Sequence, residues 1–78
     1  MFQPSEHAVR RYIERFAGNL SPAAANVHLK HIARNARFRR PLPGHARLYG
    51  SGNVNLVVQD DVILTVYRLT YRDGQWAA

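Results

Sequence analysis

Three basic side chains near the start of the chain have the types and the spacing that could support chemistry. His7, Arg11 and Arg15 recur every four residues, so a helix would align them along one face over about 12 Å. A neutral imidazole can accept a proton, and a guanidinium can hold phosphoryl oxygens. This combination suits cleavage of RNA by its own 2′-hydroxyl, with His7 as the base and Arg11 on the phosphate. Arg15 is too far along the axis for that phosphate and suits a neighbouring one.

The segment around these residues also has the pattern of a helix that packs on a core. Four apolar side chains recur at the i, i+3, i+4 and i+7 spacing: Val9, Tyr12, Ile13 and Phe16. Ser5 is suited to cap the first turn, where its side-chain oxygen can accept a bond from a backbone N–H. We therefore expect a helix over residues 6–17, with the apolar stripe inward and the basic line on a second face.

A second helix is predicted over residues 22–38. Ser21 can serve as its N-cap, and Pro22 suits the first turn, where the missing N–H costs nothing. Its packing face is formed by small and aliphatic residues at helical spacing: Ala25, Leu29, Ile32, Ala33 and Ala36. Pro41 and Pro43 cannot continue a helix and predict a short, stiff connector after it.

From His45 onward the side chains alternate with the period of strands. We expect strands over residues 46–50, 53–59 and 62–69. Two N-terminal helices followed by a three-stranded antiparallel meander make an α+β fold, with both helices on one face of the sheet. At this length, residues 1–78 are expected to form a single domain.

The turn at Asp60-Asp61 decides how the last two strands face each other. A two-residue loop would mix polar and apolar side chains on both faces. A three-residue loop closed by Val58 and Val62 would place six aliphatic side chains on one face, so we expect this register. On the other face it pairs Asn55 with Thr65 and Asn53 with Tyr67.

The positive charge is concentrated in the middle of the chain. The formal net charge is +6, and no Asp or Glu occurs between Arg15 and Gln59. A polyanion is the partner that such a distribution favours, and RNA comes first. An acidic protein such as an antitoxin would also suit it, and an ordinary solvated surface is the alternative. The basic residues expected to bind RNA are Arg15, Lys30, Arg34, Arg37, Arg39 and Arg40.

Other chemistries have less support in the sequence. His28 and His31 could share a metal on the second helix, but no carboxylate lies near them in sequence and the chain has no cysteine. We therefore expect no metal site and no cofactor. No apolar run approaches the roughly 18 residues of a membrane span, and the N-terminus lacks the apolar region of an export signal. We expect a cytoplasmic protein that does not bind membranes.

Two parts of the chain resemble a known family. The first is the opening motif formed by Ser5, His7, Ala8, Arg11, Glu14 and Arg15. It looks like the first helix of small bacterial and phage domains of unknown function, which are grouped with the barnase, EndoU, colicin and RelE-like ribonuclease toxins. The second is the segment 57–67, which is similar to that family's closing hairpin with its Thr-Val-Tyr. The resemblance implies metal-independent RNA cleavage, with His7, Arg11, Thr65 and Tyr67 in the site and Tyr67 as an acid or phosphate ligand.

Three functions remain open on the sequence. The first is the toxin-like endoribonuclease, which would depend on His7. The second is a non-catalytic binding module of the same fold, for nucleic acid or for a larger host or phage machine. The third is a metal-dependent hydrolase on His28 and His31. The predicted register also separates Thr65 and Tyr67 from the helices, because it places them on the opposite face of the sheet.

Overall fold

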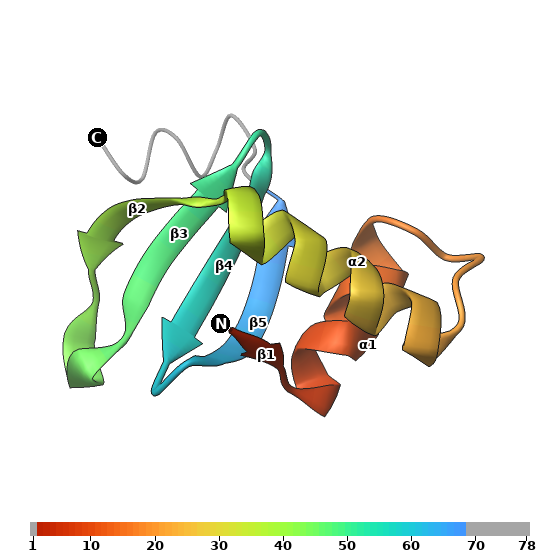
Figure 1. Ribbon diagram of the computed structural model, residues 1–78, viewed down its shortest axis with the longest axis horizontal. Coiled ribbons are helices and arrows are strands. Elements are labelled where there is room, and N and C mark those ends of the chain that lie inside the picture. Colours follow the sequence, from red (N-terminus) through yellow and green to blue (C-terminus); the bar gives the residue numbers. More distant parts are fainter. Residues whose placement is uncertain (1, 69–78) are drawn as a thin grey trace.

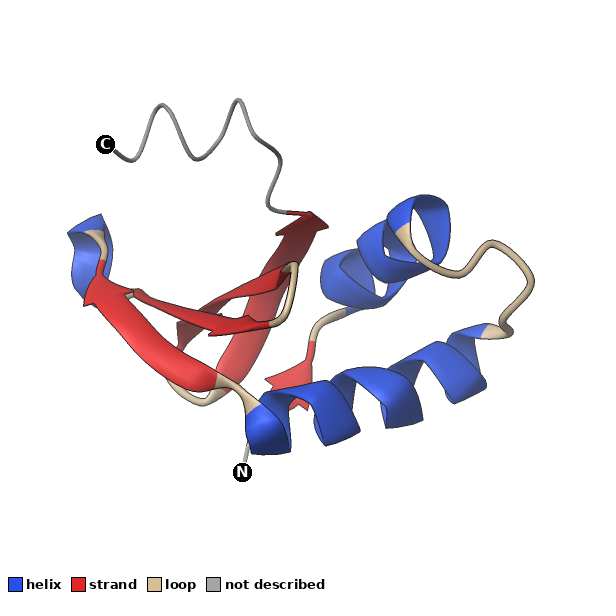
Figure 2. Cartoon of the chain, turned by 90° about the horizontal axis from the view of Figure 1, so that it is seen from above, coloured by secondary structure: helices blue, strands red, loops and turns tan. Residues whose placement is uncertain are grey.

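The computed structural model describes residues 2–68, in which two helices pack against a five-stranded mixed sheet (Figure 1). In chain order the elements are β1 (Gln3–Pro4), α1 (Glu6–Arg15), α2 (Pro22–Asn35), β2 (Arg37–Pro41), the 3-10 turn η1 (Pro43–His45), β3 (Arg47–Ser51), β4 (Val54–Gln59) and β5 (Val62–Arg68). The sheet order is β1-β5-β4-β3-β2. Both helices lie on one side of the curved sheet (Figure 2). The expected α+β class is confirmed, but the sheet contains more than the three strands that we expected.

Both helices begin at the predicted caps. The Ser5 hydroxyl accepts a bond from the backbone N–H of Ala8 at 3.0 Å, and Ser21 accepts one from Ala24 at 3.2 Å. Each helix is shorter than expected, because the backbone leaves helical geometry at Phe16 and at Ala36. Neither helix is long and apolar enough to cross a membrane, within the part of the chain that the structure describes.

The strand β2 replaces the predicted end of the second helix. Ala36 is already extended, and Phe38 pairs with Tyr49 of β3 in antiparallel register. Their rings meet edge to face, with centroids 5.7 Å apart, and this cross-strand pair stabilises the segment as a strand. Pro41 closes β2 at the outer edge of the sheet, where its missing N–H leaves no ladder bond unmade. All five residues of β2 are exposed.

The strand β1 adds the N-terminal segment of the chain to the sheet, beside β5. It pairs in parallel with the start of β5, with Gln3 beside Val62 and Pro4 beside Ile63. The backbone N–H of Gln3 donates to the carbonyl oxygen of Asp61 at 2.8 Å. Two residues carry no periodic pattern, which is why this strand was missed.

The turn between β4 and β5 differs from the predicted three-residue loop. It has two residues, Asp60 and Asp61, both in the left-handed conformation that Asp tolerates. Gln59 therefore pairs with Val62. A β-bulge at Leu64 then shifts the register and returns the apolar side chains to the inner face.

The bulge changes the predicted cross-strand pairs. Tyr67 lies opposite Asn55, where we expected Thr65, and Thr65 lies opposite Val57. The idea that six aliphatic side chains share one face is also wrong. Ile63 and Val66 are buried, whereas Leu64 is left 37% exposed. The last expected strand residue, 69, lies outside the described residues.

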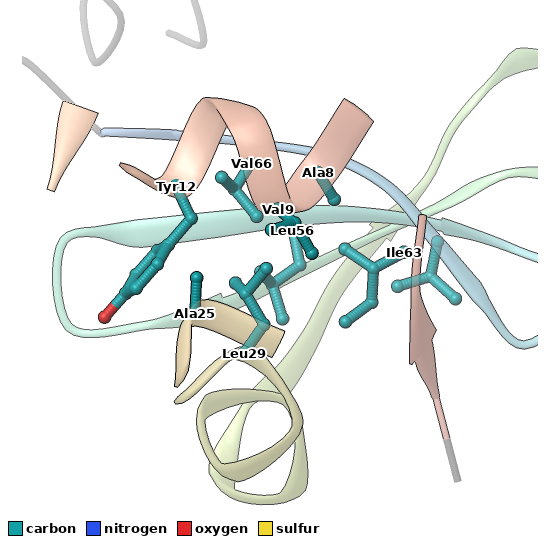
Figure 3. Close-up of a cluster of buried hydrophobic side chains, with 9 residues drawn as sticks. Ala8, Val9, Tyr12, Ala25, Leu29, Leu56, Ile63 and Val66 are labelled. Carbon is teal, nitrogen blue, oxygen red and sulfur yellow. The ribbon is translucent and has the colours of Figure 1, made fainter. Parts of the chain in front are cut away.

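The core lies between the sheet and the two helices (Figure 3). Its members come from α1, α2, β4 and β5: Ala8, Val9, Tyr12, Ala25, Leu29, Leu56, Val58, Ile63 and Val66. The predicted packing faces of both helices are confirmed, because Ile13, Ile32 and several smaller side chains pack against this cluster. A hydrophobic core of this kind fixes the position of α1 against β5.

Replacing Leu56 by Ala tests this core. Leu56 is fully buried on β4, so the Leu56→Ala variant should lower the free energy of unfolding by about 2–5 kcal/mol. Leu64→Ala removes the same atoms from the exposed bulge and should cost less than about 1 kcal/mol. Urea denaturation followed by circular dichroism measures both. Equal losses would contradict the inward and outward assignments of these two leucines.

Candidate functional site

Helix α1 is held against β5 at both ends. At its start, the backbone N–H of Ser5 donates to the carbonyl oxygen of Ile63 at 3.0 Å, and the Ser5 hydroxyl donates to that of Leu64 at 3.1 Å. At its end, the Arg68 guanidinium donates to the carbonyl oxygen of Arg15 at 3.1 Å. The helix and the strand therefore run side by side.

This pairing places the helix that carries His7 and Arg11 along the strand that carries Thr65 and Tyr67. The helix rises about 12 Å from His7 to Arg15, and β5 advances about 13 Å from Leu64 to Arg68. Along the axis that they share, His7 is therefore level with the beginning of that stretch and Arg11 with its middle, which lies between Thr65 and Tyr67.

His7 and Arg11 contact each other on the surface of α1. The Arg11 Nε–H points at Nε2 of His7, and the separation of 3.5 Å exceeds the roughly 2.7–3.2 Å of ordinary N–H hydrogen bonds. His7 is exposed and Arg11 is half-buried. An imidazole nitrogen can accept a proton and a guanidinium is permanently charged, so the contact places a group able to act as a base beside a fixed positive charge.

The basic flank of α1 faces away from α2. The opposite flank of α1, with Arg10 and Ile13, lines a groove together with Pro22 and Asn26 of α2. His7 lies across the helix from this groove, on the flank of α1 that faces away from α2. In the described chain β1 covers the outer edge of β5 only at Val62 and Ile63. The site residues of α1 are therefore open to a large ligand.

The face of the sheet opposite the helices is here called the open face because neither helix covers it, although Leu48, Gly50 and Asn55 on it are buried. It carries the remaining catalytic candidates. It is formed by two cross-strand rows: Arg37, Gly50, Asn55 and Tyr67, and then Arg40, Leu48, Val57 and Thr65. Thr65 and Tyr67 are half-buried there, on the face away from the helices as predicted. No hydrogen bond within residues 2–68 links either of them to His7 or Arg11. The two pairs lie on opposite sides of the edge of β5.

The predicted RNA-binding residues are divided between different surfaces. Arg37 and Arg40 lie in the rows of the open face, and Arg39 lies at a bulge between them. Arg37 is therefore a strand residue, although it was predicted to lie on the second helix. Lys30 and Arg34 line a small cavity with Phe2 on the helix side of the molecule. Arg15 is exposed at the end of α1.

Asn55 is a feature of the open face that sequence reasoning missed. It is only 6% exposed, and its Nδ2 has no hydrogen-bond partner among residues 2–68. Buried polar groups are nearly always paired, so an unpaired amide donor marks an unusual position. An Asn in an alternating strand resembles any solvent-facing residue, and its burial depends on neighbours that the sequence does not reveal.

One of the two histidines considered for a metal, His28, contacts α1. His28 Nδ1 lies 3.5 Å from the hydroxyl of Tyr12, and their rings meet edge to face. Between residues 2 and 68, no group of three or more potential ligands from His, Asp and Glu is clustered. His28 is thus a packing partner of α1.

Comparisons with known proteins do not indicate a function for this chain. No protein-family model, curated protein or solved structure matches the chain. The resemblance to ribonuclease toxins therefore stays a prediction from the sequence, which depends above all on His7 and Arg11 and on Thr65 and Tyr67.

Replacing Ser5 by Ala tests how α1 is held in place. Ser5→Ala removes both the helix cap and the bond to Leu64, and should lower the free energy of unfolding by about 1–2 kcal/mol. Ser21→Ala removes only a cap, on α2, and should cost about 0.5–1 kcal/mol. Chemical denaturation of the two variants compares them directly. If Ser21→Ala proves as costly, the bond from Ser5 to the strand contributes nothing.

Proposed function

We propose that this chain is a metal-independent endoribonuclease of the toxin type, which cleaves RNA by 2′-hydroxyl transesterification. The observation that carries the proposal is the contact between the Arg11 Nε–H and Nε2 of exposed His7. It combines a proton acceptor and a phosphate-binding cation on one accessible helix flank.

In the proposed reaction, the 2′-oxygen forms a bond to phosphorus as the bond from phosphorus to the 5′-oxygen breaks. His7 takes the 2′-hydroxyl proton at Nε2. The Arg11 Nε–H points at that same atom in the free protein, so a phosphate oxygen must first take over its N–H. Substrate binding would then both position the phosphate and release the base.

Tyr67 is the proposed acid for the leaving 5′-oxygen, and Thr65 a second contact to the reacting phosphate. The support for these roles is their position: both are half-buried on β5, which runs beside α1. RNA would then cross the edge of β5 between the basic flank of α1 and the open face. Arg15 would bind a phosphate next to the cleaved one, and Arg37, Arg39 and Arg40 would bind the strand farther along.

A toxin of this kind is expected to have an acidic antitoxin as its partner. The charge distribution supports this part of the proposal, because the net charge is +6 and the segment between Arg15 and Gln59 contains no acid. Such a partner would compete with RNA for the same arginines.

His7→Ala tests the proposed base. The wild-type protein should cleave RNA in EDTA and leave 2′,3′-cyclic phosphate ends. His7→Ala should reduce the rate by about 10²- to 10⁴-fold. His31→Ala is the matched control, because His31 is an exposed histidine on α2 and should leave the rate unchanged. The assay follows a labelled oligonucleotide on a gel and identifies the product ends.

Two results would reject the catalytic proposal. One is intact RNA after long incubation with the wild-type protein. The other is cleavage that survives in His7→Ala but stops when metal is removed, which would also reopen the hydrolase alternative on His28 and His31.

A non-catalytic RNA-binding module is the second candidate, and β2 favours it. Arg37, Arg39 and Arg40 are all exposed on this edge strand. If they bind phosphates, log K should fall linearly with log salt, with a slope of about −0.7 per contact on single strands. Arg39→Ala with Arg40→Ala should make that slope shallower by about 1.4. An unchanged slope would exclude these side chains from the interface.

A further inference from the structure

The open face contains a buried hydrogen-bond donor next to a guanidinium group. Asn55 and Gly50 are direct cross-strand partners, and both lie on this face. The Nδ2 of Asn55 finds no partner within residues 2–68, although the side chain is 94% buried. A donor in this state gains a hydrogen bond from any ligand that brings an oxygen acceptor to it.

Gly50 leaves room for the Arg39 side chain on the strand next to Asn55. A Cβ atom placed on Gly50 would lie 3.0 Å from Nη2 of Arg39 and 3.1 Å from its Cζ, and closer still to Nε. The guanidinium therefore occupies the space of the missing side chain. Because Gly50 is paired with Asn55, the charged group and the unpaired amide are neighbours on one surface.

The chemistry of this pair selects a phosphate. Arg39 can only donate, and the unpaired atom of Asn55 is also a donor, so both require oxygen acceptors. Neither row of the open face contains a carboxylate, whereas Arg37 and Arg40 add positive charge on the same strand. An anion with several oxygen atoms suits these donors and this positive charge better than a neutral carbonyl group does.

We propose that Arg39 and Asn55 form a binding site for a backbone phosphate of RNA, separate from the phosphate held at Arg11. This inference rests on the proposed function, because it assumes RNA as the ligand. Arg39 is exposed, so its side chain can turn outward and admit a phosphate oxygen to Asn55. Gly50 is a positioning residue, since it touches Arg39 and not the ligand.

Gly50→Ala separates positioning from charge, because it keeps both binding groups and displaces the guanidinium. The assay is fluorescence anisotropy with a single-stranded 2′-O-methyl RNA, which binds but cannot be cleaved. Gly50→Ala and Arg39→Ala should each weaken binding about tenfold, the effect of one charge-assisted hydrogen bond. Their combination should add little to either alone. Gly18→Ala, which meets no side chain, is the matched control.

Asn55→Leu tests the amide through two measurements, the stability of the fold and the affinity for RNA, which should not fall together. It removes an unpaired buried donor, so the free energy of unfolding should stay the same or rise. RNA binding should nevertheless weaken about tenfold. A purely structural Asn55 would show the reverse, with lower stability and unchanged affinity. Arg39→Ala is at an exposed position and keeps the test valid if the leucine variant does not fold.

The outcomes distinguish this site from the proposed reaction. If the wild type cleaves RNA through His7 but Gly50→Ala and Asn55→Leu bind normally, only the Arg39–Asn55 site is overturned. If the wild type neither binds nor cleaves RNA, the proposed function fails together with it. Oligonucleotides of U, A and C should bind equally well, and a strong base preference lost in Asn55→Leu would overturn the assignment to phosphate.

Discussion

The hydrogen bond from the Ser5 hydroxyl to the carbonyl oxygen of Leu64 connects the two layers of this fold. It exists because Leu64 is the extra residue of a β-bulge and is left without a partner on β4. A two-residue turn alone would place polar side chains on the inner face of the sheet. The bulge shifts the register of β5, so that the inner face stays apolar. One irregularity in β5 thus keeps Val66 in the core and fixes the start of α1, and through it the position of His7.

The sequence was sufficient for the features that depend on local rules. Ser5 and Ser21 mark both helix starts, because a cap satisfies backbone N–H groups whatever the tertiary structure. The end of α2 and the strand β2 depend instead on a distant partner, since Phe38 is held by Tyr49. The turn at Asp60-Asp61 was predicted wrongly because a uniform ladder was assumed, and a bulge leaves no signature in the alternation of side chains.

The candidate site likewise has features that follow from local rules and features that depend on distant contacts. His7 and Arg11 were placed together correctly, because residues four apart on a helix are always neighbours. Their relation to Thr65 and Tyr67 depends on how α1 lies along β5, which involves contacts between residues far apart in the chain. Asn55 could not be identified from the sequence, because its unusual property is its burial and not its residue type. Gly50 was expected at the end of a strand, but the sequence does not show that the Arg39 side chain fills the space beside it.

The strand β2 also determines how this protein meets copies of itself. An outermost strand offers free N–H and C=O groups along its edge and can pair with the same strand of a second molecule. Here such pairing would bring three guanidinium groups from each copy together, at a strand already irregular at Arg39 and closed by Pro41. Charge repulsion and broken geometry therefore oppose self-association along this edge. By their charge alone, the arginines of β2 disfavour the edge-to-edge pairing that leads to aggregation.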